Sequence, residues 1–322
     1  MGRSVLAASV TVLGIGLAGC GDKQVGSAPR ARSRPAGAAA YRATPAPAPA
    51  GAFQPDPALF PRKHAPGAGD WIAVHRESVD SFEQYVEDAP TRPNATRRVI
   101  VLQPIGPFSA AENELLETLS DYLGRYFQLE TRIADELPLP TMGMRAWQEP
   151  DKVVIQYRTD VLLYQVLGPR LPKDAVAYLG ITTADLFPNP SWNYVFGVGN
   201  LNHRVGIYSL ARLDPAFYDE PDTPASHSQM LRRALAVLAH ETGHMFSLRH
   251  CQAHQCLMNG ANSLVELDRG TPWLCPDCLR KLHYNTGFDI RRHYEDLRAF
   301  YAARRLNDAV DWLDRRLATL GR

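Results

Sequence analysis

The sequence predicts one α/β domain preceded by a targeting segment and a linker. Short apolar runs typical of buried strands alternate with helix-forming stretches between residues 98 and 244. The C-terminal part has the apolar spacing of helices. With 322 residues, 45% of them hydrophobic, the chain can build one large domain with a tail, which we place at residues 70–322.

Residues 1–20 have the pattern of a bacterial lipoprotein signal peptide. Arg3 precedes an apolar run, residues 5–17, that is too short for a comfortable membrane span. Leu-Ala-Gly then leads directly to Cys20, so we expect cleavage before Cys20 and acylation of that residue. Gly21 does not suggest retention at an inner membrane, which favours an anchor on the periplasmic face of the outer membrane. The alternative is an ordinary secretion signal with an incidental cysteine.

Residues 21–69 are expected to be a disordered linker. They are dominated by Ala, Pro, Gly and Arg, and residues 44–49 repeat Pro at every second position. Such a composition cannot bury a core and favours an extended, mobile chain. We therefore interpret this segment as a spacer between the membrane and the domain.

The first half of the domain should contain most of the sheet. Residues 98–102 form an apolar run typical of a buried strand. Ser109 can cap a helix with Glu112 three residues later, and this helix should end near residue 127. Further strands are expected at residues 128–134, 175–182, 194–198 and 205–210, and a further helix at residues 157–166.

The C-terminal part should be helical, with one apolar and one charged face. The apolar residues spaced at helical intervals are Ile290, Tyr294, Leu297 and Tyr301, followed by Val310, Leu313 and Leu317. The arginines expected on the solvated face are Arg291, Arg292, Arg304, Arg305, Arg315 and Arg316.

The stretch around residue 240 predicts a metal-binding helix. Residues 230–239 are rich in strong helix formers and contain no Gly or Pro. His240 and His244 are four residues apart, so a helix places both imidazoles on one face, where they can bind one zinc ion. Glu241 is rotated by about 100° on the same turn, where it can reach a water on the metal but not the metal itself. This is the geometry that a general base requires.

A catalytic zinc ion usually has three protein ligands and one water, so a third ligand is needed. His250 follows His244 by six residues and would be out of reach on a continuous helix. We therefore expect the helix to break between them. Metalloproteases with this spacing normally place Gly at the break, whereas this chain has Ser247, at a cost of about 1 kcal/mol or more. His254 and Glu266 are the alternative third ligands.

Four cysteines follow the third histidine closely. They are Cys251, Cys256, Cys275 and Cys278, and the last two have the Cys-x-x-Cys spacing of a zinc knuckle. Four thiolates around one ion would make a closed structural zinc site. Two disulfides are the alternative, which an exported protein permits. Because Cys251 directly follows His250, either arrangement would restrain the loop that carries the third histidine.

This pattern resembles the archaemetzincin family of zinc metalloproteases. The pattern is His-Glu-x-x-His, five residues, His-Cys, four residues, Cys-x-Met, and then Cys-x-x-Cys. The resemblance covers roughly residues 70–300 and also includes residues 70–72, 82–85, 180–187 and 193–197.

The resemblance implies both the fold and the roles of the site residues. It implies a metzincin-like domain with a mixed twisted sheet, an active-site helix, a Met-turn and a helical C-terminal part. It implies a sheet-edge strand over the cleft at residues 194–198, and a methionine turn beneath the metal at Met258. The implied ligands are His240, His244 and His250 for a catalytic zinc ion, with Glu241 as base, and Cys251, Cys256, Cys275 and Cys278 for a structural zinc ion.

The function that these observations predict is zinc-dependent hydrolysis of peptide bonds. We expect two zinc ions per chain, a peptide or protein substrate, and a monomer held to the membrane through Cys20. A net charge of +1 argues against a nucleic-acid partner. The alternative is a zinc-stabilised surface domain that binds partners without cleaving them, but such a domain has no use for a base beside an open metal position.

Overall fold

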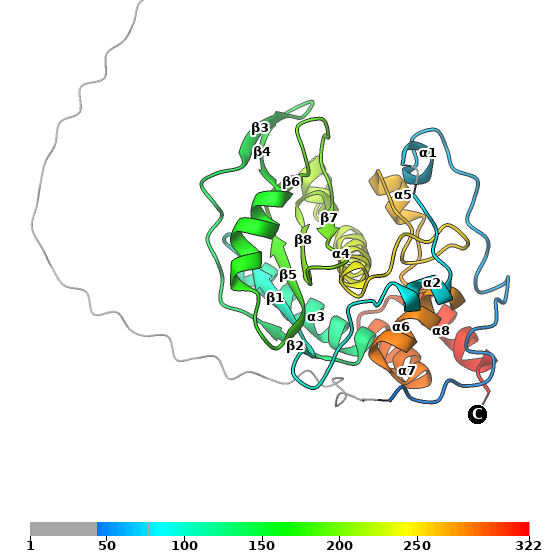
Figure 1. Cartoon of the computed structure of the whole chain (residues 1–322). Coiled ribbons are helices and arrows are strands. Elements are labelled where there is room, and N and C mark those ends of the chain that lie inside the picture. The colour runs from blue at the N-terminus through cyan, green and yellow to red at the C-terminus, as the bar shows by residue number, and fades with distance from the viewer. Residues whose placement is uncertain (1–43, 76, 322) are drawn as a thin grey trace, which may run out of the picture. The chain divides into compact units, whose positions relative to one another are not determined.

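The computed structural model describes residues 44–75 and 77–321 (Figure 1). The expected signal peptide, with Cys20, and the first part of the expected linker lie outside the described residues. Within the described ranges, no helix is both long enough and apolar enough to cross a membrane.

A five-stranded sheet forms the centre of the domain, in the order β2-β1-β5-β8-β7. Strands β2, β1, β5 and β8 are parallel, and β7 pairs antiparallel with β8 at one edge. The strands β1, β5 and β8 are buried along their whole length, as expected for parallel strands that are covered on both faces. The bounds are Val99–Pro104 for β1, Glu130–Ile133 for β2, Ala175–Thr182 for β5, Gly197–Gly199 for β7 and Val205–Ser209 for β8.

Two helices cover one face of this sheet, and a short helical segment covers the other. Ile100 and Leu102 of β1 pack in the same core as α3 (Ala110–Phe127) and α4 (Pro224–Met245). Val99 and Val101, which alternate with them, pack against the π-helix η1 (Val161–Leu167). The mixed sheet between helical layers confirms the predicted α/β class (Figure 1). The predicted capping box of Ser109 and Glu112 is present at the start of α3.

A second, three-stranded sheet was not predicted. It consists of β3 (Met144–Gln148), β4 (Val153–Arg158) and β6 (Asp185–Phe187), in the order β3-β4-β6. The expected helix at residues 157–166 is therefore wrong in its first part, because residues 153–158 form a strand rich in β-branched residues. The helical turn begins only at Val161.

The remaining helices lie mainly in the C-terminal half. They are α1 (Trp71–Val74), α2 (Phe82–Glu87), α5 (Leu264–Asp268), α6 (Pro276–Thr286), α7 (Ile290–Ala303), α8 (Asn307–Thr319) and the short turns η2 (Gly168–Arg170), η3 (Ala211–Leu213) and η4 (Pro215–Tyr218). The predicted apolar stripe of α7 is confirmed, since its four residues are buried.

Arg316 corrects the prediction that the C-terminal arginines are solvated. Arg316 is only 1% exposed, although its neighbour Arg315 is exposed. The Arg316 guanidinium donates to the backbone oxygen of Ala52 and lies 5.1 Å from the ring centre of Phe60. The arginine is therefore buried because a segment far away in the sequence covers it.

That segment also corrects the expected linker. Residues 44–60 lie along α6–α8, as the dark blue trace beside the orange and red helices shows, and the chain then runs past residues 253–255 towards α1 (Figure 1). Leu59 and Phe60 are buried, and the indole nitrogen of Trp312 donates to the Leu59 oxygen at 3.2 Å. The Phe60 ring packs edge-on against Trp312, with 5.6 Å between the ring centres. The predicted boundary at residue 70 is therefore wrong for this part of the chain, because a few apolar residues among the prolines complete the C-terminal core.

Candidate metal centres

Helix α4 positions the first two histidines. Thr223 and Ser226 form a capping box at its start, and Pro224 occupies the first turn, where its missing N–H costs nothing. The helix then continues without interruption to Met245. His240 and His244 consequently lie one turn apart on the same face, with 2.9 Å between their Nε2 atoms.

His250 returns to these two histidines, as the sequence analysis expected. Its ring centre lies 5.2 Å from that of His240 and 4.8 Å from that of His244. The ligand atoms of the three histidines all lie within 4.8 Å of one another. Three converging imidazoles match the ligand set of an open catalytic zinc site.

The outer nitrogens of the two helical histidines are bound to backbone oxygens. Nδ1 of His240 lies 2.8 Å from the Leu257 oxygen, and Nδ1 of His244 lies 2.7 Å from the Leu248 oxygen. A carbonyl accepts only from a protonated nitrogen, so Nε2 of each ring is left as the metal-binding atom. Burial lowers the pKa of His240 to about 3 and that of His244 well below its usual range, which keeps both rings neutral.

The break in α4 depends on Ser247, which takes the left-handed conformation with φ of +66°. Its hydroxyl donates to the Leu201 oxygen at 2.9 Å and accepts from the Thr91 backbone N–H at 3.0 Å. The preceding Phe246 oxygen accepts from the Tyr85 hydroxyl at 2.6 Å. These bonds give a physical reason why serine is tolerated where this spacing normally has glycine: its side chain contributes hydrogen bonds that glycine cannot make.

Glu241 lies beside the histidines and is 6% exposed. Burial raises its pKa to about 8, and a hydrogen bond from the Gly199 backbone partly opposes this shift. Strand β7 passes so close that a Cβ at Gly197 would lie 2.8 Å from the Glu241 carboxylate, and one at Gly199 would lie 2.5 Å from the Glu241 backbone oxygen. The roles of these two glycines were not predicted from the sequence, although their alternation around Val198 was an available signal.

Met258 lies beneath the helix that carries the site. Its side chain is fully buried, and a Cβ at Gly243 would lie 2.7 Å from its sulfur atom. The Met258 oxygen accepts from the Cys251 N–H at 2.7 Å, which ties this turn to the loop after His250. The turn therefore supports the floor of the site.

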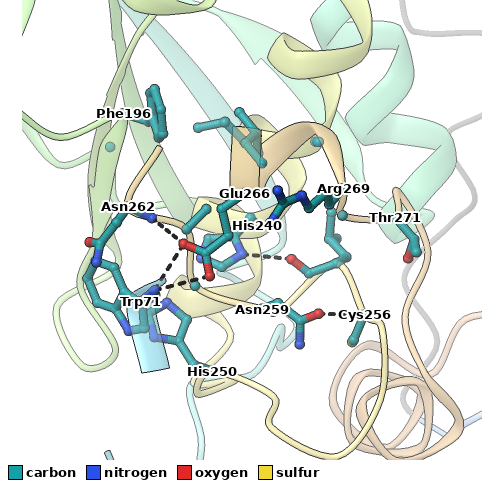
Figure 2. Close-up of a pocket in the computed structure, with 18 of the residues that line it drawn as sticks. Trp71, Phe196, His240, His250, Cys256, Asn259, Asn262, Glu266, Arg269 and Thr271 are labelled. Carbon is teal, nitrogen blue, oxygen red and sulfur yellow. Dashed lines mark hydrogen bonds between the residues drawn. The ribbon is translucent and has the colours of Figure 1, made fainter. Parts of the chain in front are cut away.

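The two alternative third ligands are turned to other partners. Nδ1 of His254 bonds the Phe60 oxygen at 2.9 Å. The Glu266 carboxylate accepts from the backbone N–H groups of Trp71 and Asn262, at 3.0 and 2.8 Å (Figure 2). The geometry therefore favours His250 over both of them.

A second cluster consists of the four buried cysteines. Their sulfur atoms all lie within 4.8 Å of one another, and none is in a disulfide. The Cys256 sulfur accepts from the N–H groups of Met258 and Cys275, at 3.4 and 3.3 Å. Burial raises the pKa of the Cys256 thiol, and bonds to neighbouring thiols raise that of Cys278. The raised pKa values mean that ionising these buried thiols is unfavourable. A bound cation would offset that unfavourable free energy and hold four thiolates together, so the cluster fits a closed zinc site.

The histidines open into a cleft of about 1250 Å³. Helix α4 and strand β7 form one side, and residues from 63–78 and 255–273 form the other. Figure 2 shows Trp71 beside His250 on that second side. The site therefore combines neutral ligands, a carboxylate and a cavity, which is an arrangement suited to metal-assisted hydrolysis.

Comparisons with known proteins show what this chain is similar to. The sequence matches the profile of Peptidase family M54 over residues 110–284. Archaemetzincin-2 of Homo sapiens is 34% identical over 275 residues, which cover 76% of each chain. Archaemetzincin-1 of Mus musculus is 29% identical over 278 residues, which cover 77% of this chain and 55% of that protein. The crystal structure of an archaemetzincin from Methanopyrus kandleri is 26% identical, with a TM-score of 0.47, and covers 60% of this chain and 97% of that one.

We predict that the Ser247 hydroxyl outweighs the strain of its backbone. Ser247→Ala should lower the free energy of unfolding by about 1–3 kcal/mol, because it loses both hydrogen bonds and keeps the left-handed conformation. Ser247→Gly loses the same bonds but removes about 1 kcal/mol of strain, so it should be less stable than the native chain and more stable than the alanine variant. Urea unfolding measures this order. A glycine variant more stable than the native chain would contradict it.

Proposed function

The chain belongs to peptidase family M54, the archaemetzincins, and is a zinc metallopeptidase; from this premise we propose how its own residues carry out peptide hydrolysis. The observation that carries the proposal is the convergence of His240, His244 and His250 beside the buried carboxylate of Glu241. These three histidines would hold the catalytic zinc ion. Bound there, zinc would activate a water molecule and polarise the scissile carbonyl.

Glu241 is proposed to act as the general base. It follows a ligand directly on α4, so the helix holds its carboxylate next to the metal position but outside the ligand set. A zinc ion bound beside it would favour the ionised carboxylate, which accepts a proton from the attacking water and returns it to the amine that leaves. The close approach of Gly197 and Gly199 keeps bulk water away from this carboxylate on the side of β7.

We propose that the substrate peptide lies along β7. This strand is the edge of the main sheet and lines the cleft. An extended peptide can bind such an edge through backbone hydrogen bonds, which would place a scissile carbonyl in the cleft beside the three histidines. We also propose that the chain acts as a monomer, and light scattering of the purified protein tests that state.

The four cysteines are proposed to hold a second, structural zinc ion, giving two per chain. The support is their common burial and the mutual proximity of all four sulfur atoms, whereas two disulfides would separate them into bonded pairs. This ion would restrain the loop after His250, because Cys251 is the next residue.

We predict that Glu241→Gln removes turnover and leaves metal binding intact. The variant keeps the size of the side chain but cannot accept the proton, so the rate should fall by about 10²–10⁴-fold. Turnover is checked by mass spectrometry of a digested peptide library. Metal binding is checked by the zinc content from elemental analysis. His250→Ala is the control that should lose one zinc ion. A Gln variant with native activity would refute the role as base.

We predict that the cysteine cluster is sensitive to chelators and insensitive to reductants. Removal of the ion leaves four buried thiols without the cation that holds them together. A strong chelator should therefore lower the melting temperature, and a reductant alone should not. Cys278→Ser should reduce the zinc content by one ion per chain. Mass spectrometry that finds these four cysteines resistant to alkylation until they are reduced would instead establish disulfides.

We propose that the protein is an exported lipoprotein anchored at Cys20, which lies outside the described residues. The support is the sequence of residues 1–20 alone, and the outer membrane remains the favoured location. We expect the native chain in the membrane fraction and Cys20→Ser in the soluble periplasmic fraction, as measured by immunoblotting. A native chain found in the soluble fraction would disprove the anchor.

A further inference from the structure

The third histidine differs from the first two in the group that binds its outer nitrogen. Nδ1 of His240 and of His244 faces a backbone oxygen, whereas Nδ1 of His250 lies 2.9 and 2.8 Å from the two carboxylate oxygens of Glu77. His250 also lies on a loop, without a helix to set its orientation. His250, the only one of the three histidines that is not on α4, is therefore the one whose Nδ1 has a carboxylate partner.

We propose that Glu77 is a positioning residue of the metal site, holding His250 so that Nε2 faces the ion. This inference rests on the proposed role of His250 as a zinc ligand. A carboxylate that accepts from Nδ1–H selects the tautomer with an unprotonated Nε2 and makes that nitrogen a stronger donor to the metal. Glu77 lies outside residues 110–284, over which the family profile matches, and 173 residues before its partner.

Further contacts hold the two segments together. The Gln252 side chain donates to the backbone oxygen of Glu77 at 3.1 Å, so both the side chain and the backbone of Glu77 bind the His250 loop. Trp71 packs edge-on against the His250 ring, with 5.0 Å between the ring centres (Figure 2). Gly260 permits this position, since a Cβ there would lie 2.5 Å from the Trp71 ring.

The contact differs from an ordinary surface ion pair. The side chains of His250 and Glu77 are 14% and 30% exposed, so solvent screens the pair only in part. Loss of such an outer partner commonly weakens metal binding by about 10–100-fold. The expected consequence of losing Glu77 is therefore a weaker zinc site.

A competing account is that Glu77 merely attaches its segment to the domain. The same segment has an independent anchor, because Lys281 donates to the Asp80 carboxylate at 2.8 Å and their side chains are 7% and 8% exposed. Asp80→Asn removes the negative charge of this buried ion pair and should therefore loosen the segment without touching His250. It is the matched control for a purely structural effect.

The test is a zinc titration of the full chain. A chelator first removes the more weakly held zinc ion, and Zn²⁺ is then returned in competition with a chromophoric chelator. Glu77→Ala should bind it about 10–100-fold more weakly than the native chain. Glu77→Gln should show a smaller loss, because its amide oxygen still accepts from Nδ1–H. The visible spectrum of the Co²⁺-substituted site should change in Glu77→Ala and stay native in Asp80→Asn.

The outcomes separate this inference from the proposed function. Native affinity in Glu77→Ala, or an equal loss in Asp80→Asn, would overturn the role of Glu77 and leave the zinc peptidase intact. A native chain that binds no zinc at the histidines would overturn both. Because Glu77→Gln preserves the size of the side chain, it keeps the test decisive if Glu77→Ala fails to fold.

Discussion

The metal site depends on the point at which α4 stops. A helix that continued past Met245 would carry His250 away from its two partners, so the ligand set exists only because the backbone reverses at Ser247. Ser247 holds this left-handed conformation through its own hydroxyl, which joins Leu201 on one side to Thr91 on the other. The reversal is therefore fixed by two distant segments, one that precedes β1 and one that connects β7 to β8.

The two candidate metal centres are mechanically connected. His250 and Cys251 are adjacent, so the loop that supplies the last histidine also supplies the first cysteine. The backbone of Cys251 is bound to Met258, whose side chain lies directly under α4 at Gly243. A closed cysteine site would thus stiffen the floor of the open histidine site. This arrangement suits catalysis, because ligands held by rigid neighbours need not be reordered when a substrate binds.

Local chemistry made several features readable from the chain. The apolar run of β1, the Ser109 capping box and the uninterrupted helix formers of α4 each act through neighbours in sequence, so their patterns predicted the structure. The hairpin of β3 and β4 was missed, because residues near 157 carry apolar spacing that fits a helix as well as a strand. Arg316 and residues 44–69 were misjudged together, since the arginine donates to Ala52 and lies beside Phe60 of that segment.

The amino-acid sequence by itself determined the chemistry of this protein: two imidazoles and a carboxylate on one helical turn, a third imidazole beyond a break, and four thiols, the last two in a knuckle spacing. Helical periodicity and donor type are local properties, and they need no knowledge of the fold. Only the tertiary structure decided which group orients each ligand. Glu77, Leu201 and Gly199 reach the site from segments distant in sequence, and no local pattern records that approach. The ligands are thus encoded by residue type, whereas their orientation arises from packing between distant parts of the chain.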